Sequence, residues 1–181
     1  MSYSIRRLTR DDVDAYRAVR LEALTRHPES YGTSADTFAA LPREAVQTTM
    51  DRMAFFGVVT DGGELAGIVA YARDTGERET HRGWLIQVYV KPDMRGTGAA
   101  LALLEAAVEH ARGEVIQLHL MVGAHNAPAV RLYEKAGFAT YGTDPRCIYV
   151  NGRYIDEHMM VRFLDHEPAQ QQGTMESDKN E

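Results

Sequence analysis

The stretch from Val88 to Leu104 constrains the fold of this chain more than any other part of the sequence. It starts with β-branched and aromatic residues, passes a Pro-Asp turn and a Gly-x-Gly step at Gly96 and Gly98, and ends in a run of Leu and Ala. That order predicts a strand, a tight loop and a helix. Glycine lacks a Cβ, so the loop backbone can approach a ligand closely. The unpaired N–H groups and the dipole of the following helix favour a phosphate or pyrophosphate there, beside the charge of Arg95.

Two better-known phosphate loops do not fit this stretch. A P-loop needs a Lys-Ser/Thr pair after its last glycine, whereas Ala99 and Ala100 follow Gly98. A dinucleotide fingerprint needs three glycines in a βαβ unit near the start of a domain, and this loop has two. The predicted phosphate loop is therefore neither a P-loop nor a dinucleotide-binding loop.

The loop matches the pattern Arg-x-x-Gly-x-Ala, with Arg95, Gly98 and Ala100 at its fixed positions, after a Val-x-Val-x-Pro strand end. It resembles the coenzyme A pyrophosphate loop of the GNAT superfamily of N-acetyltransferases. A second stretch, Asn126 to Phe138, is similar to that family's Asn-x-x-Ala-x-x-Leu-Tyr-x-x-x-Gly-Phe helix. Both motifs occur in the family's order, and the resemblance covers roughly Ile5 to Leu164.

The resemblance implies an α/β fold with a central, mostly antiparallel sheet, splayed parallel strands and flanking helices. It also implies an enzyme that moves the acetyl group of acetyl-CoA to a primary amine, by direct attack within a ternary complex. The residues that would hold the coenzyme are Val88, Tyr89 and Val90 through their backbone, together with Arg95, Gly96, Thr97, Gly98, Ala99, Ala100 and Asn126. An amide of the strand would stabilise the developing oxyanion.

The sequence offers a clear candidate for the general acid but none for the general base. Tyr133 stands where the family places a hydroxyl near the coenzyme sulfur, so it is the candidate acid for the leaving thiolate. Some members carry a glutamate on the strand before the loop, but the stretch from Leu85 to Val90 has no carboxylate, and Gln87 cannot usefully accept a proton. A water relay is the favoured route from the amine. Three weaker candidates for the base are Asp156, Glu157 and His119, the last of which fits a structural role better.

The acceptor amine is not identified by any motif. In the family, the first helix pair and its loop form one wall of the acceptor pocket, which makes Glu22, Tyr31 and Phe38 candidate substrate residues. A solvated carboxylate and two core aromatics are the alternative interpretation of these three side chains. The acceptor is either a small molecule or a peptide amine. A non-catalytic acyl-CoA sensor is the alternative function, and the missing strand carboxylate keeps it open.

The hydrophobic pattern predicts the remaining elements. The expected strands are Ser4–Leu8, Phe55–Thr60, Glu64–Arg73, Trp84–Val90, Val115–Val122, Cys147–Val150 and Arg153–Leu164, and the expected helices begin near Val13, Arg43, Ala99 and Pro128. Asp61-Gly62-Gly63 and Asn151-Gly152 are hairpin turns. We expect one domain over residues 1–165. The polar tail, residues 166–181, is expected to be disordered.

Composition limits the partners and the compartment. The formal net charge is −6 without a Lys or Arg run, which argues against nucleic acid. No apolar run reaches the length of a membrane span or a signal peptide, so we expect a cytoplasmic protein without a membrane partner. The seven histidines show no paired ligand spacing, so no metal is expected. No histidine lies near the single Cys147 in sequence, which disfavours a covalent acetyl-cysteine. The resemblance also allows a homodimer.

Overall fold

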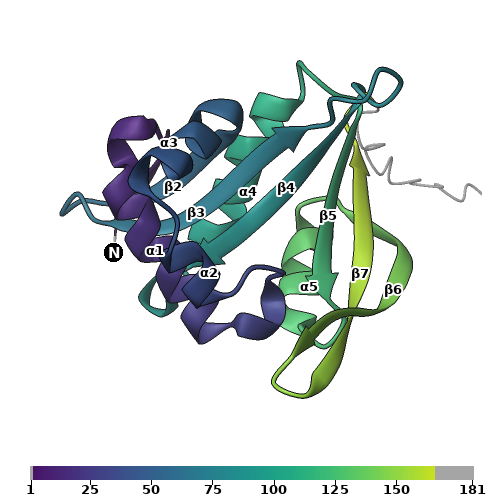
Figure 1. The fold of residues 1–181 in the computed structure, drawn as a ribbon. Coiled ribbons are helices and arrows are strands. Elements are labelled where there is room, and N and C mark those ends of the chain that lie inside the picture. Colours follow the sequence, from purple (N-terminus) through teal and green to yellow (C-terminus); the bar gives the residue numbers. More distant parts are fainter. Residues whose placement is uncertain (1, 166–181) are drawn as a thin grey trace, which may run out of the picture.

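A computed structural model describes residues 2–165 and shows one seven-stranded sheet within them, in the order β1-β2-β3-β4-β5-β7-β6 (Figure 1). The strands are β1 (Tyr3–Arg7), β2 (Ala54–Thr60), β3 (Leu65–Arg73), β4 (Arg82–Val90), β5 (Gln117–Gly123), β6 (Ala139–Val150) and β7 (Arg153–Phe163). The helical segments are η1 (Arg10–Asp12), α1 (Val13–Arg26), η2 (Pro28–Ser30), α2 (Ala35–Ala39), α3 (Arg43–Arg52), η3 (Pro92–Met94), α4 (Ala99–Ala111) and α5 (Ala127–Lys135).

All neighbouring strands of this sheet are antiparallel except β4 and β5, which are parallel. Helix α4 supplies the crossover between these two strands, as a parallel connection requires. The mixed α/β sheet predicted from the sequence is thus confirmed. None of the helices within residues 2–165 combines the length and the apolar character needed to cross a membrane.

Helices cover the sheet on both faces, and each face has its own core. Behind the sheet, α4 and α5 bury side chains such as Leu103, Leu104 and Tyr133 against the strands. In front, α1 to α3 cover β2 to β4, and α1 contributes Val13, Tyr16, Val19, Ala23 and Leu24 at helical spacing. In Figure 1, no described helix lies in front of β5, β7 and β6. The front of the molecule therefore has a helix-covered half and an open half.

The structure adds elements that the sequence pattern did not predict, among them the short segments η1, η2 and η3. The chain also forms a short helix, α2, after η2, and the Ser34 hydroxyl caps it by accepting from the Thr37 amide at 3.1 Å. Strand β6 begins at Ala139 rather than at Cys147. Gly142, Asp144 and Pro145 hide this strand in the sequence, because they break the β pattern, and the pairing with β7 is irregular there. The predicted tail lies outside the described residues.

Candidate active site

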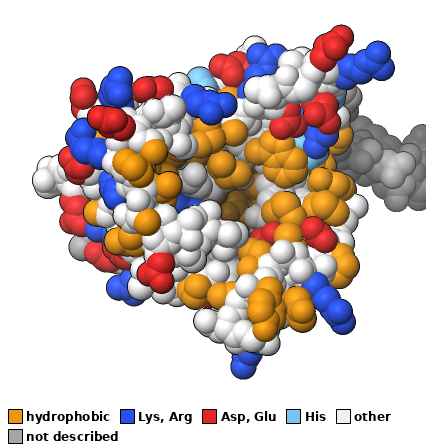
Figure 2. All heavy atoms as spheres, in the orientation of Figure 1, with side chains coloured by type: hydrophobic (Ala, Val, Ile, Leu, Met, Phe, Trp, Pro, Cys, Tyr) orange, Lys and Arg blue, Asp and Glu red, His pale blue; other side chains and the backbone are white. Residues whose placement is uncertain are grey.

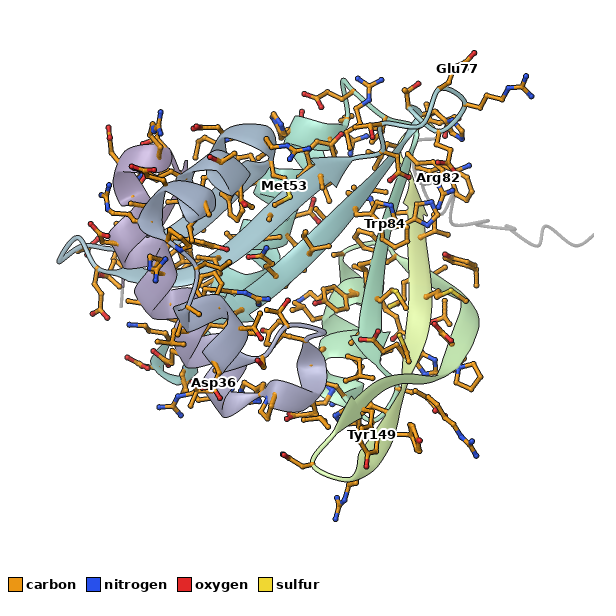
Figure 3. All side chains as sticks on the ribbon, in the orientation of Figure 1. Asp36, Met53, Glu77, Arg82, Trp84 and Tyr149 are labelled. Carbon is orange, nitrogen blue, oxygen red and sulfur yellow. The ribbon has the colours of Figure 1, made fainter. Side chains whose placement is uncertain are left out.

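Strand β4 departs from both of its neighbours at one level of the sheet. On the β3 side, Ile68 pairs with Tyr89 and Ala70 pairs with Ile86, so Gln87 and Val88 together face one residue of β3. On the β5 side, the parallel pairing ends at Trp84. The sheet is thus open between β4 and β5 from that point on, and Figure 3 labels Trp84 in the upper part, where the two strands are still together. The splayed strands that the family resemblance implied are present.

The bulge in β4 is held by two tyrosine hydroxyls from the front layer. Gln87 has φ +58°, a left-handed conformation that costs a non-glycine residue roughly 1–2 kcal/mol. Tyr16 on α1 donates a hydrogen bond to Gln87 Oε1 at 2.6 Å, and Tyr31, just after η2, donates one to the carbonyl of Val88 at 2.9 Å. These bonds offset the strain. The first bond holds the side chain of Gln87, and the second holds the backbone of β4 at Val88.

The loop from Arg95 to Gly98 uses backbone conformations that its two glycines allow. Gly96 and Gly98 have φ +74° and +85°. The buried Met94 anchors the loop, and the Thr97 hydroxyl bonds the Met94 carbonyl at 2.7 Å and the Ala99 amide at 3.3 Å. Within residues 2–165, four amides of the loop and the first turn of α4 have no acceptor: those of Gly96, Gly98, Ala100 and Leu101. This geometry can hold a pyrophosphate.

Tyr133 projects from α5 into the core behind the opening. Asn126 caps this helix by accepting from the Ala129 amide at 3.2 Å. The Tyr133 side chain is 7% exposed and packs edge-on against Phe138. Burial, and secondarily the nearby Tyr31, raises the pKa of Tyr133 above the ordinary value of a phenol. Within residues 2–165, its hydroxyl has no hydrogen-bond partner. Tyr133 is thus a protonated phenol that is able to donate.

The three predicted acceptor residues have different surroundings. Tyr31 reaches the opening through its bond to Val88. Glu22 lies further along α1, where it accepts from the Tyr89 hydroxyl at 2.8 Å and pairs with Arg26. Phe38 is 7% exposed and packs against Tyr16 in the front core. Of the three, the packing favours Tyr31 as a pocket residue.

The three predicted base candidates also have different surroundings. Glu157 on β7 is 7% exposed and accepts a hydrogen bond from the Cys147 thiol at 3.1 Å. Asp156 is exposed and accepts from the Arg146 amide at 2.8 Å. His119 stacks on Trp84 with ring centroids 5.1 Å apart, and burial, then the charge of Arg82, lowers the pKa of its imidazole. A neutral, stacked His119 fits the structural role, which leaves Glu157 as the buried carboxylate of the open half.

Comparison with known proteins identifies the family. Residues 17–138 match the family model described as the acetyltransferase (GNAT) family. The chain belongs to the GNAT acetyltransferase family. Together with the loop and the opened sheet, this match confirms the resemblance drawn from the two motifs.

Curated GNAT relatives share about a third of the aligned residues. The L-methionine sulfoximine/L-methionine sulfone acetyltransferase of Pseudomonas aeruginosa is 36% identical over 107 residues, which cover 57% of this chain and 60% of that protein. A mycothiol acetyltransferase of Nocardiopsis dassonvillei is 34% identical over 138 residues, which cover 74% of this chain and 41% of the relative. The chain therefore spans only about half the length of such relatives.

Solved structures share the fold over nearly the whole chain. A GNAT-family acetyltransferase from Streptococcus pneumoniae superimposes with a TM-score of 0.76 and 27% identity, covering 90% of this chain and 99% of that one. A Salmonella typhimurium protein solved with its cofactor acetyl-CoA gives a TM-score of 0.79 at 18% identity, covering 94% and 98% of the two chains. At 18% identity, the similarity to the Salmonella typhimurium protein shows a shared fold only.

The open half of this GNAT fold is concave. A groove of about 810 Å³ runs between Glu29 of η2, His125 after β5, and the hairpin of β6 and β7, where Tyr154 and Asp156 line it. Figure 2 shows this face of the molecule hollowed near its centre, with apolar side chains around the hollow and carboxylates beside it. This half of the sheet is therefore accessible from solvent.

One buried charged residue next to the opening was not predicted from the sequence. Arg20 on α1 is buried and stacks over the ring of Tyr31, with its Cζ 4.4 Å from the ring centroid. Its position four residues after Tyr16 places it on the buried face of the helix. This spacing was visible in the sequence, but an arginine on a predicted helix is usually solvated.

Within residues 2–165, no group of three or more His, Cys, Asp or Glu side chains is arranged to hold a metal.

Proposed function

We propose that the chain is an acetyl-CoA-dependent N-acetyltransferase that acts on a primary amine in a ternary complex. The observation that carries the proposal is the arrangement of three features around one opening. These are the glycine loop with its free amides, the edge of β4 that β5 leaves unpaired, and the protonated Tyr133. The first suits the pyrophosphate, the second the pantetheine arm and thioester, and the third the departing sulfur.

The reaction we propose is a direct transfer. Only on the order of one alkyl amine in a thousand is neutral at pH 7, since its pKa is near 10.4. The proton therefore leaves through water toward the acceptor side, where Glu157 is the buried carboxylate of the open half. The neutral nitrogen then attacks the thioester carbonyl, and an amide of β4 from Val88 to Val90 stabilises the oxyanion. The nitrogen loses its second proton through the same water route, and the carbon–sulfur bond breaks as Tyr133 protonates the thiolate. Tyr133 then recovers its proton from water.

A small-molecule acceptor is the substrate class that we favour. Relatives are named for L-methionine sulfoximine and L-methionine sulfone, for mycothiol, and for spermidine, and all of these are small molecules. The wide groove is also compatible with a peptide amine. A cytoplasmic location and a homodimer stay predictions from the sequence and the family.

The experiment is a thiol-release assay with purified protein, acetyl-CoA and a panel of amines that contains amino acids, polyamines, amino sugars and a short peptide. Release of coenzyme A with at least one amine, and detection of the acetylated amine by mass spectrometry, is the expected result. Coenzyme binding without release for any amine would contradict the proposal and favour the acyl-CoA sensor.

A further inference from the structure

Among the described residues 2–165, the buried arginine of the front layer, Arg20, has no anionic partner. The Arg20 side chain is 6% exposed, and its Nη1 is buried without a hydrogen-bond acceptor. Within residues 2–165, the guanidinium takes part in no ion pair. Its contact is the stacking on Tyr31. A buried charge without a partner is a rare and costly feature, so its presence needs an explanation.

The charge of Arg20 persists in spite of its burial. Desolvation lowers the pKa of Arg20, but a guanidinium is not deprotonated at physiological pH in proteins. Stacking on the face of Tyr31 offsets part of the desolvation cost. It satisfies none of the guanidinium N–H groups, because the face of a ring is a poor substitute for an oxygen acceptor. The N–H groups of Arg20 are therefore left to bind an anion from outside the protein.

Arg20 lies next to the place where the acceptor must react. Tyr31, on which it stacks, bonds the carbonyl of Val88 at the opening of the sheet. Tyr16, one helical turn earlier, bonds Gln87 of the same bulge. The guanidinium thus stands on the α1 wall of the site, about one tyrosine side chain away from the strand that would hold the thioester.

The opposite wall carries the opposite charge. Glu157 pairs across the ladder with Gly123 at the end of β5. Met160 of the same strand is buried in the rear core with Tyr133, so the alternation of a strand turns Glu157 toward the open front. The two walls of the opening therefore present a buried cation on α1 and a buried carboxylate on β7.

We propose that Arg20 binds a carboxylate of the acceptor, so that the substrate is an amino acid; this rests on the proposed transferase function. A guanidinium matches a carboxylate with two parallel hydrogen bonds. One buried positive charge neutralises one negative charge, whereas a phosphate monoester would bring nearly two. The ammonium group of the same molecule then faces the wall of Glu157. Its nitrogen lies close to its own carboxylate, which suits the short span from Arg20 to Val88.

The test compares kcat/KM for matched acceptors in the wild type, Arg20→Gln and Arg17→Gln. The acceptors are the amino acid that reacts best in a panel of L-amino acids and L-methionine sulfone, and its carboxamide. Arg17 is the control, because it lies on the same helix but bonds the carbonyls of Leu41 and Ala39. Each comparison is made between variants on one substrate, so differences in amine pKa cancel.

We expect Arg20→Gln to lower kcat/KM for the acid about 10- to 100-fold, mainly through KM, and to change the carboxamide value by less than about threefold. Arg17→Gln should change kcat/KM for the acid and for the carboxamide by the same factor. Equal losses on acid and carboxamide in Arg20→Gln would overturn the proposal while the transferase stands. If the wild type releases no thiol with any amine, it is the proposed function that fails.

A measurement on the wild type alone covers the case in which Arg20→Gln does not fold. The deaminated acid of the best substrate keeps the carboxylate and lacks the nucleophile. It should inhibit competitively against the acceptor, and its carboxamide should be at least about tenfold weaker. Equal inhibition by acid and carboxamide would overturn the assignment of Arg20.

Discussion

Three tyrosine hydroxyls lie near the opening of the sheet, and burial raises the pKa of each further above neutral pH. Burial raises the pKa of Tyr16 and of Tyr31 to about 12, and the pKa of Tyr133 is raised as well. Tyr16 and Tyr31 already donate to Gln87 and Val88. Tyr133 alone of the three is left to donate to a ligand, which is why it is the proposed acid.

Tyr133→Phe removes this donor and keeps the ring that packs against Phe138. We expect kcat for thiol release to fall about 100-fold or more, because general acid catalysis contributes on that order. Coenzyme affinity from calorimetry should change little. Tyr149→Phe is the matched control, since Tyr149 on β6 is 64% exposed and is not among the residues that line the groove. A Tyr133→Phe enzyme with unchanged kcat would remove Tyr133 from the mechanism.

Glu157 and Asp156 are adjacent carboxylates with different surroundings, so they form a natural pair of variants. Glu157→Gln should lower kcat/KM at pH 7 by about tenfold or more, with a smaller loss at high pH where more amine is already neutral. Asp156→Asn should stay within about threefold, because an amide oxygen still accepts from Arg146. A larger effect of Asp156→Asn than of Glu157→Gln would contradict the proposed role of Glu157 in accepting the proton.

Cys147 is held as a thiol. Local desolvation raises the pKa of Cys147 to about 12, and the carboxylates of Glu157 and Asp144 act in the same direction. A raised thiol pKa means less thiolate at every pH below it, so iodoacetamide should alkylate Cys147 at pH 8 at least about 100-fold more slowly than a free thiol with a pKa near 8.5. Mass spectrometry over time gives the rate. Alkylation as fast as glutathione would contradict this environment and reopen a covalent intermediate.

At the scale of elements, the loop before α4 needs glycine at position 98 because of its backbone conformation, not because a side chain would lack room. A Cβ at Gly98 would meet only the Tyr3 hydroxyl, at 3.6 Å, yet the φ of +85° strains any other residue. Gly98→Ala should therefore cost about 1 kcal/mol of unfolding free energy and weaken coenzyme binding about tenfold, because the loop amides turn away. Gly63→Ala is the control: its φ of +81° and open surroundings predict the same loss of stability with unchanged affinity.

The elements that carry the motifs were predictable, and those that shape the acceptor side were less so. Gly96, Gly98 and Asn126 specify local conformations, so the loop and the α5 cap follow from the sequence alone. The bulge at Gln87 does not, because it depends on Tyr16 and Tyr31 arriving from distant segments. The irregular start of β6 was missed for a related reason, since its breaker residues are tolerated only through pairing with β7.

At the scale of the molecule, the sheet acts as a partition with one opening. Helices α4 and α5 lie behind it, and the loop at the start of α4 is on that side. The front carries α1, η2 and the concave half formed by β5 to β7 (Figure 1). A coenzyme bound at the loop and an acceptor bound in front therefore meet only where β4 leaves β5. The account depends on this meeting point.

A crystal structure with a non-hydrolysable acetyl-CoA analogue tests that point most directly. We predict the pyrophosphate at the amides of Gly96 and Gly98, the pantetheine arm along β4 beyond Trp84, and the sulfur position within roughly hydrogen-bonding reach of the Tyr133 hydroxyl. A coenzyme bound at the loop whose acyl group points away from the β4–β5 opening, or that binds elsewhere, would contradict the account.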